Sequence, residues 1–422
     1  MVTYMAGDND LSEYGVRDIK EMEETGVGEE TYCLVEFDSE GPQPNGFNGT
    51  IRYEITKKDP RTGKAYRKVI ERFEDRDSGD KKTLVKCLKW AKEDYNSEHY
   101  LVNIWNHGKG IGVRKRLSFL SDRKGAALRG RAGTLFTHKK NLNKLTKGRA
   151  IAFDYSTGNN LDMRELSAAL QEAGFSDSDK KIDILGFDAC LMNMLEVGYE
   201  MSKHAHFMVG SEELEPFEGW PYALDLKSMN LLRIDVPKLA KELVKNYRQF
   251  YSHPPYDTDE YWPVTQSAID LSHISELAKS VDEFASAITS SLRANYDAAL
   301  VKISNLRENV QRYAIEEDYD QYVDVGDLAL LFRDYYDDSA VKTTASGVIK
   351  NLKKAILAEI NLGDDVENSH GLTIWFPETA HKYHINKKSY ESLAMTRMFG
   401  SWNKFLNTYH RSKGRDLKRG EF

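Results

Sequence analysis

Short apolar runs rich in β-branched and aromatic residues recur along the first 250 residues, and an amphipathic stretch separates each run from the next. Uninterrupted apolar strands that alternate with helices are typical of a sheet covered on both faces. We therefore expect the α/β class, with a mostly parallel sheet flanked by helices. The expected strands are 1–4, 32–37, 100–105, 150–153, 182–187 and 207–209.

Helical periodicity fills the intervals between these strands. Leu84, Leu88, Ala91 and Tyr95 recur on one helical face, which makes the nearby Cys87 a core residue. A second helix is expected between Asp162 and Gly174, because Asp162 and Glu165 have capping-box spacing.

The pattern changes near residue 255, which suggests two parts. Residues 1–255 are expected to form the sheet-containing domain, and 256–422 a more helical C-terminal region that opens with a long helix at 274–292. A late strand near 371–377 is expected to add to the main sheet, followed by helix at 390–409.

Composition excludes several classes of protein. No run reaches the roughly 20 apolar residues of a membrane-spanning helix, so no membrane partner is expected. Only three cysteines occur, which is too few for a disulfide framework or a CxxC zinc site. No export signal is evident, and the sequence does not decide the cellular compartment of the protein.

Two predicted strands are followed directly by residues whose side chains can take part in catalysis. The run YLVNIWNHGKG places His107 after one strand, and KIDILGFDACLMN places Asp188 and Cys190 after another, just before an expected helix. The carboxyl ends of parallel strands meet at one edge, where α/β proteins hold their sites. His206 and His370 begin strands and so belong to the opposite edge.

A thiol beside an imidazole suits nucleophilic catalysis. A neighbouring histidine and a helix N-terminus both favour the thiolate of Cys190, and His107 would protonate the leaving amine. The backbone N–H groups of Gly108 and Cys190 would bind the oxyanion. The alternative is a buried core thiol and an ordinary His-Gly turn. No acid partner for His107 is evident, so a backbone carbonyl is left to orient it.

These motifs resemble the clostripain family, cysteine peptidases with a caspase-like fold. The resemblance covers nearly the whole chain. It rests on YMAGDNDL, NIWNHGKGIG, AFDYSTGNNLDMREL, ILGFDACLMNMLEV, VGSEELEPFEGWPY, YVDVGDLA and GLTIWFP, in that order.

The resemblance implies an endopeptidase with a His107–Cys190 dyad that cuts peptide or protein substrates after Arg or Lys. Asp188 would lie at the base of the pocket for that side chain, where a buried carboxylate selects a cation; its alternative is a helix N-cap. The SEELEPFEGW loop is expected to form the pocket wall, with Glu215 or Glu218 adding negative potential. Trp220 would offer a flat face for an Arg, or else pack in the core. Asp8 and Asp10 follow the first strand at the same predicted edge, where they are expected to cap the next helix or, as the alternative, to line the cleft.

Family members of this kind are activated by self-cleavage between the two motifs, where this chain carries a basic loop. Residues 114–149 hold twelve Lys or Arg and one acid, although the whole chain has a net charge of −7. A tethered basic loop has a high effective concentration at an acidic cleft. The expected cuts follow Arg149 or Lys147, with upstream cuts after Arg114 or Arg116. The sequence does not decide whether the cut chains stay associated.

Two other functions compete with this interpretation. The loop could bind nucleic acid or another acidic partner, but it lacks interleaved aromatics and the remaining chain is strongly acidic, so no nucleic acid is expected. A catalytically silent scaffold is the other alternative. The chemistry requires no cofactor. The resemblance implies calcium as a stabiliser, although DRDSGD at 75–80 lacks the later ligands of an EF-hand.

Overall fold

A computed structural model provides the structure of the chain. It describes residues 1–41, 43, 46–74, 76–112, 151–231, 235–253, 263–314 and 321–419. The predicted cleavage residues Arg114, Arg116, Lys147 and Arg149 lie outside the described residues.

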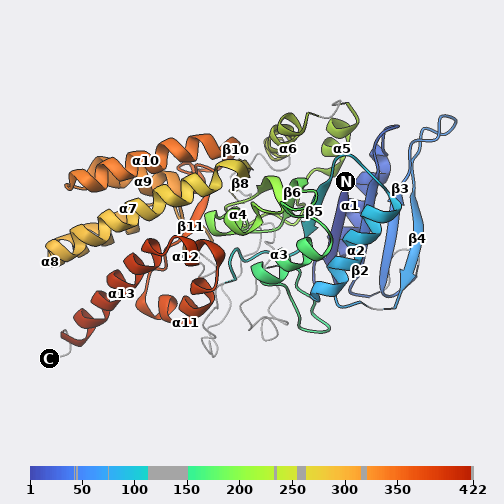
Figure 1. Cartoon of the computed structure of the whole chain (residues 1–422). Coiled ribbons are helices and arrows are strands. Elements are labelled where there is room, and N and C mark those ends of the chain that lie inside the picture. Colours follow the sequence, from blue (N-terminus) through green and yellow to red (C-terminus); the bar gives the residue numbers. More distant parts are fainter. Residues whose placement is uncertain are drawn as a thin grey trace, which may run out of the picture.

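A nine-stranded sheet forms the centre of the molecule (Figure 1). In spatial order its strands are β10 (Ile356–Leu362), β8 (Val264–Asp270), β7 (Ala205–Gly210), β6 (Ile182–Asp188), β5 (Leu101–Trp105), β1 (Val2–Gly7), β2 (Cys33–Ser39), β3 (Thr50–Ile55) and β4 (Arg67–Phe73). The five strands from β7 to β2 are parallel, and antiparallel pairs extend the sheet on both sides. The expected α/β class and parallel core are confirmed.

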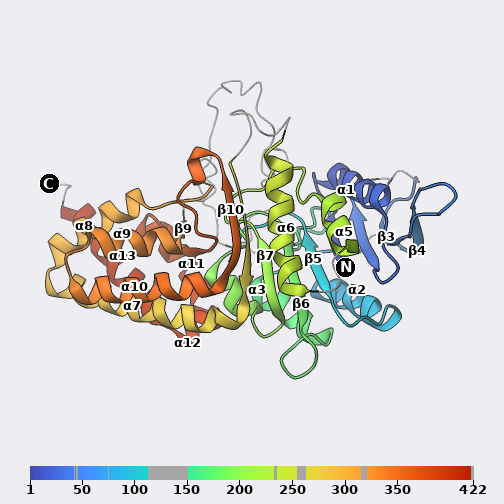
Figure 2. The same ribbon diagram turned by 90° about the horizontal axis from the view of Figure 1, so that it is seen from above.

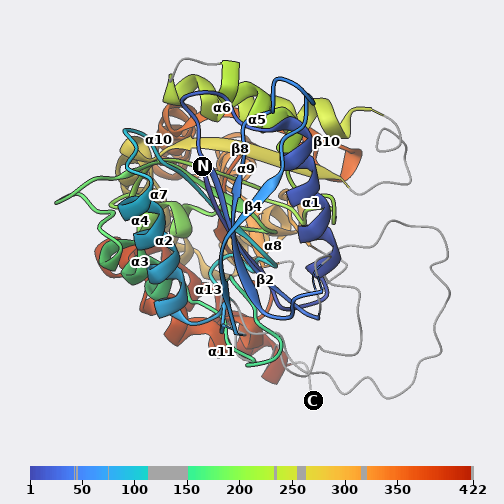
Figure 3. The same cartoon turned by 90° about the vertical axis from the view of Figure 1, so that its right-hand side faces the viewer.

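Helices cover both faces of the sheet (Figure 3). One face carries α1 (Ser12–Thr25), α5 (Tyr222–Leu231) and α6 (Val236–Tyr251), and the other carries α2 (Lys81–Asp94), α3 (Met163–Glu172) and α4 (Leu195–Met201). The capping box predicted for α3 is present: the Asp162 side chain accepts from the backbone N–H of Glu165, whose carboxylate accepts from the N–H of Asp162. Cys87 is buried in α2, as expected.

The C-terminal helices lie beside β10, at the end of the sheet opposite β4 (Figure 2). They are α7 (Ile274–Ala294), α8 (Tyr296–Asn309), α9 (Val325–Tyr335), α10 (Ser339–Ala355), α11 (Ala380–Glu391), α12 (Ala394–Met398) and α13 (Ser401–Arg419). The long helix predicted from 274 is confirmed as α7. The helix expected at 390–409 is instead divided among α11, α12 and α13.

Two strand predictions are wrong. The late strand is β11 (Thr373–Trp375), but it pairs with β9 (Tyr322–Asp324) in a separate two-stranded sheet. The C-terminal strands that do join the main sheet are β8 and β10. Residues 151–153 are buried without forming a strand, because Ala152 has a φ of +58°, which interrupts an extended backbone. Among the described residues no helix has the length and apolar character needed to cross a membrane.

Candidate active site

The two predicted chemical segments meet at the carboxyl edge of the sheet. Strands β5 and β6 are parallel neighbours with Trp105 opposite Asp188, so His107 and Cys190 each follow their strand by two residues. A Cβ placed on Gly108 would lie 2.1 Å from the carbonyl oxygen of Cys190 and 2.9 Å from its nitrogen. The backbones of the two loops are therefore in direct contact, and the prediction of a shared edge is confirmed.

The imidazole of His107 is buried between a carboxylate and a phenol. Its Nε2 lies 2.8 Å from Oδ1 of Asp10 and 3.3 Å from the hydroxyl of Tyr155. The sequence suggested no acid partner for this histidine. The expectation that Asp10 or Asp8 caps the next helix is wrong, because the N-cap of α1 is Leu11, which makes no side-chain capping bond.

The segment that follows the basic loop is attached to the histidine loop. Asn106 accepts the backbone N–H of Phe153 at 2.7 Å and donates to its carbonyl at 3.2 Å. Ile151 is fully buried and forms isolated β-bridges with Gly108 and Leu161. These contacts place Tyr155, which follows residues 113–150 in the chain, beside His107.

Cys190 is fully buried beneath the backbone of Glu215. The Glu215 N–H donates to Sγ at 3.1 Å, and burial, followed by the charge of Glu215, raises the pKa of the thiol well above its usual value. The expectation that a helix N-terminus activates this thiol is wrong, because α4 begins only at Leu195. In this conformation the thiol of Cys190 is buried and protonated.

Asp188 occupies a buried position at the end of β6. Its Oδ2 accepts the hydroxyl of Tyr222 at 2.7 Å, and a Cβ on Gly219 would lie 2.7 Å from Oδ1. Gly219 also has a φ of +58°, so a glycine suits this close approach. Burial raises the pKa of Asp188 to about 7. The helix N-cap alternative is wrong, because the N-cap of α4 is Met194.

Three further buried carboxyl groups surround Asp188, namely Asp18, Glu215 and Asp225. Burial is the main reason that the pKa of each is raised, and the charge of Asp188 raises all three further. Among the described residues, none of these four acids forms an ion pair with a Lys, Arg or His. The region is a carboxyl-rich interior that lacks a compensating cation in the described part of the chain.

The remaining predicted pocket residues occupy different environments. Trp220 is 3% exposed, and its Cη2 would lie 2.9 Å from a Cβ on Gly186, so the indole packs on β6. Glu218 is half-buried beside Phe217, whose ring stacks on Tyr14 with centroids 4.7 Å apart. The substrate-binding roles of Glu218 and Trp220 remain predictions.

Three buried aspartates gather near the same edge. Carboxylate oxygens of Asp8, Asp38 and Asp154 all lie within 4.8 Å of one another. Ser156 donates to both Asp8 and Asp154, and Thr50 donates to Asp38 at 2.9 Å. Three carboxylate oxygens at this separation fit a hard cation such as Ca²⁺, whose oxygen ligands lie at about 2.3–2.6 Å.

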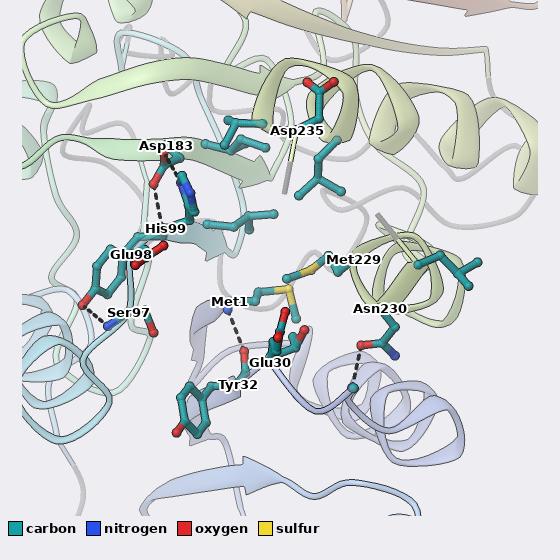
Figure 4. A pocket seen from close by; sticks show the side chains of 18 of the residues that line it. Met1, Glu30, Tyr32, Ser97, Glu98, His99, Asp183, Met229, Asn230 and Asp235 are labelled. Carbon is teal, nitrogen blue, oxygen red and sulfur yellow. Dashed lines mark hydrogen bonds and ion pairs between the residues drawn. The ribbon is translucent and has the colours of Figure 1, made fainter. Parts of the chain in front are cut away.

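A cavity of about 690 Å³ lies at the opposite edge of the sheet. Met1, Leu101 and Ile184 line it from the amino ends of β1, β5 and β6, and Asp183 accepts from the Tyr100 backbone and contacts His99 at 2.9 Å (Figure 4). Parallel strands place their carboxyl ends at the other edge, so this cavity is separate from the Cys190 site.

Known proteins share sequence and structural features with this chain. The sequence model of the clostripain family matches residues 3–123 and 133–409. No curated protein sequence matches. An inactive zymogen C11 protease from Parabacteroides distasonis has a similar structure, with 18% identity, a TM-score of 0.63, and 94% of this chain and 96% of that chain covered.

Two structures from Bacteroides thetaiotaomicron show the same fold. One is a secreted C11 cysteine protease with 15% identity and a TM-score of 0.65, covering 95% of this chain and 97% of that one. The other is a secreted C11 cysteine protease in complex with an irreversible peptide inhibitor, with 18% identity, a TM-score of 0.59, and 92% and 97% coverage.

Proposed function

Because the chain belongs to the clostripain family of cysteine proteases, we propose that it cleaves peptide bonds after Arg or Lys. Cys190 is the nucleophile and His107 its proton-transfer partner. The observation that carries this assignment is the contact of Gly108 with the backbone of Cys190, which brings the histidine and cysteine loops together. A silent scaffold would not require these two residue types at this junction.

The reaction follows from the positions of these groups. Sγ of Cys190 attacks the substrate carbonyl carbon while His107 takes the thiol proton, and the oxyanion is held by the backbone N–H groups of Gly108 and Cys190. His107 then passes the proton to the leaving amine as the C–N bond breaks. Water releases the acid from the thioester and restores the thiol.

Selection of a basic side chain is supported by the carboxyl-rich interior around Asp188. Carboxyl groups that are buried together cannot all ionise, which agrees with the raised pKa values of Asp188 and Glu215. A guanidinium or ammonium group entering beside Asp188 supplies the missing positive charge and favours ionisation. A neutral side chain of the same shape leaves the acids protonated and gains no ion pair.

We also propose that the chain is a zymogen that cuts itself within 114–149, after Arg149 or Lys147, with upstream cuts after Arg114 or Arg116. The closed, protonated thiol of Cys190 supports a state that needs activation. Ile151 is buried and bridged to Gly108, so a cut after Arg149 frees a new N-terminus at residue 150, one residue before this contact. The same burial favours cut chains that remain associated.

Matched substrates and variants test the proposed function. Wild type and Cys190→Ala are incubated separately, and chain length is followed by intact mass. Peptides ending in Arg, Lys or citrulline, the uncharged analogue of Arg, report specificity. We expect only wild type to cut itself and to prefer Arg or Lys over citrulline by at least about 100-fold, and Asp188→Asn to reduce that ratio at least about tenfold.

Other results would support other functions. Equal cleavage of the Arg and citrulline peptides would overturn the basic specificity while leaving the dyad in place. A chain that stays whole yet hydrolyses basic peptides would overturn self-activation. A chain that remains inactive after loop cleavage in trans would favour a scaffold, or a binder of acidic partners through the basic loop.

The residues near the site suit the expected calcium ion as a stabiliser. Asp8, Asp38 and Asp154 supply three carboxylate oxygens from the ends of β1 and β2 and from the segment after the basic loop. We propose that an ion held there joins these segments and supplies charge neutralisation, with no part in the proton transfers of His107.

A further inference from the structure

The unexpected contact of His107 with Asp10 suggests a role for a residue outside the dyad. The two side chains are 3% and 19% exposed, and Nε2 lies 2.8 Å from Oδ1. Tyr155 adds a second, longer contact at 3.3 Å to the same nitrogen. Both contacts thus restrain the imidazole through Nε2.

A rigid turn presents Asp10 to the histidine. The Asn9 side chain accepts the N–H of Leu11 at 3.0 Å and donates to the carbonyls of Ala6 and Phe153 at 2.7 and 2.8 Å. Asn9 is fully buried. The turn is therefore fixed to the end of β1 and to the segment that carries Tyr155, which limits the movement of Asp10.

The register of the sheet places this turn beside the histidine loop. Strand β1 is the parallel neighbour of β5, with Met5 opposite Trp105, so their carboxyl ends lie side by side. Asn106 crosses between them by donating to the carbonyl of Ala6. The contact of Asp10 with His107 thus follows from the order of strands in the sheet.

We propose that Asp10 is a positioning residue that holds the ring of His107 by Nε2 and leaves Nδ1 to exchange a proton with Cys190. This inference rests on the proposed function, because it assigns a role within the same reaction. A proton donated from Nε2 to a carboxylate fixes the neutral tautomer whose Nδ1 is the base. When His107 takes the thiol proton, the carboxylate also stabilises the resulting imidazolium.

The test uses the full chain cleaved within 114–149, with Asp10→Asn, Asp10→Ala and Asp10→Glu. Glu13→Gln is the matched control, since Glu13 is an exposed acid three residues away that loses the same charge. We expect Asp10→Asn to lower kcat about 10²- to 10⁴-fold with KM within about threefold, and Asp10→Glu to recover part of the loss. Glu13→Gln should stay within about twofold of wild type.

Alkylation of Cys190 by iodoacetamide gives a readout that needs no substrate. Without the anion, less thiolate forms at pH 6, so the ratio of alkylation rates at pH 6 and pH 9 should fall about tenfold in Asp10→Asn. Simple loosening of the fold would instead raise both rates. Wild-type kcat, or an unchanged rate ratio, in Asp10→Asn would overturn the proposal. If wild type cleaves no basic peptide, the proposed specificity fails, while the alkylation ratio still decides the role of Asp10.

Discussion

Gly108 is the position at which one added methyl group should most directly disrupt the site. In Gly108→Ala the new Cβ would lie 2.1 Å from the carbonyl oxygen of Cys190, 2.9 Å from its nitrogen and 3.1 Å from the carbonyl carbon of Ala189. All three neighbours are backbone atoms, which cannot rotate away. A normal contact needs about 1 Å more separation, so the histidine and cysteine loops must move apart by roughly that distance.

Both activity and stability should respond to this separation. A 1 Å misplacement of reacting groups costs about 100-fold in rate, and overpacking at a buried site costs about 1–3 kcal/mol. We therefore expect kcat/KM on basic peptides to fall at least about 100-fold in Gly108→Ala, with a lower melting temperature. The fall in activity should exceed what the unfolded fraction at assay temperature explains.

The control is Gly347→Ala in α10, where an added Cβ meets no atom within 4 Å. Alanine is a better helix former than glycine by about 1 kcal/mol, so this variant should be fully active and slightly more stable. If Gly108→Ala kept wild-type activity and melting temperature, the contact between the two loops would be wrong, and with it the argument that joins His107 to Cys190.

Two further predictions concern stability. Burial raises the pKa of Glu196 from 4.5 to about 7. The contribution of this carboxyl group to folding stability is therefore largest below pH 4.5, the pKa in the unfolded chain, and is lost as the pH rises through about 7. In denaturant titrations at pH 5 and 8, Glu196→Gln should remove about 3 kcal/mol of this pH dependence. An unchanged slope would contradict this account. Removal of divalent cations with EDTA should lower the melting temperature by several degrees, and calcium should restore it. Asp154→Asn should be insensitive to EDTA, whereas equal sensitivity of both proteins would exclude this cluster as the calcium site.

Local patterns were enough to locate the main elements. The apolar runs that became β5 and β6 predicted strands because they are short and continuous, and the capping box at Asp162 marked the start of α3. The parallel topology then followed from the alternation of strands and helices. The prediction failed at residues 151–153, where a positive φ at Ala152 cannot be recognised from an apolar run.

Contacts between segments that are far apart in the chain were not predicted from the sequence. For Asp10 a helix cap was preferred over a position lining the cleft, because local spacing favours a cap, whereas its actual partner, His107, lies 97 residues away. A signal existed in the placement of Asp10 just after the first strand, but its use requires knowing that β1 lies beside β5. Pairing between strands that are not consecutive is set by packing of the whole sheet.

The sequence by itself determined the α/β class, the two strand ends that carry His107 and Cys190, and the family to which the chain is similar. These depend on local periodicity and on motifs that are continuous in the chain. Only the tertiary structure decided that Asp10 contacts His107, that Glu215 closes over Cys190 and that four acids share one interior. These features arise where segments far apart in sequence are buried together, and burial then alters the hydrogen bonding and ionisation of each group.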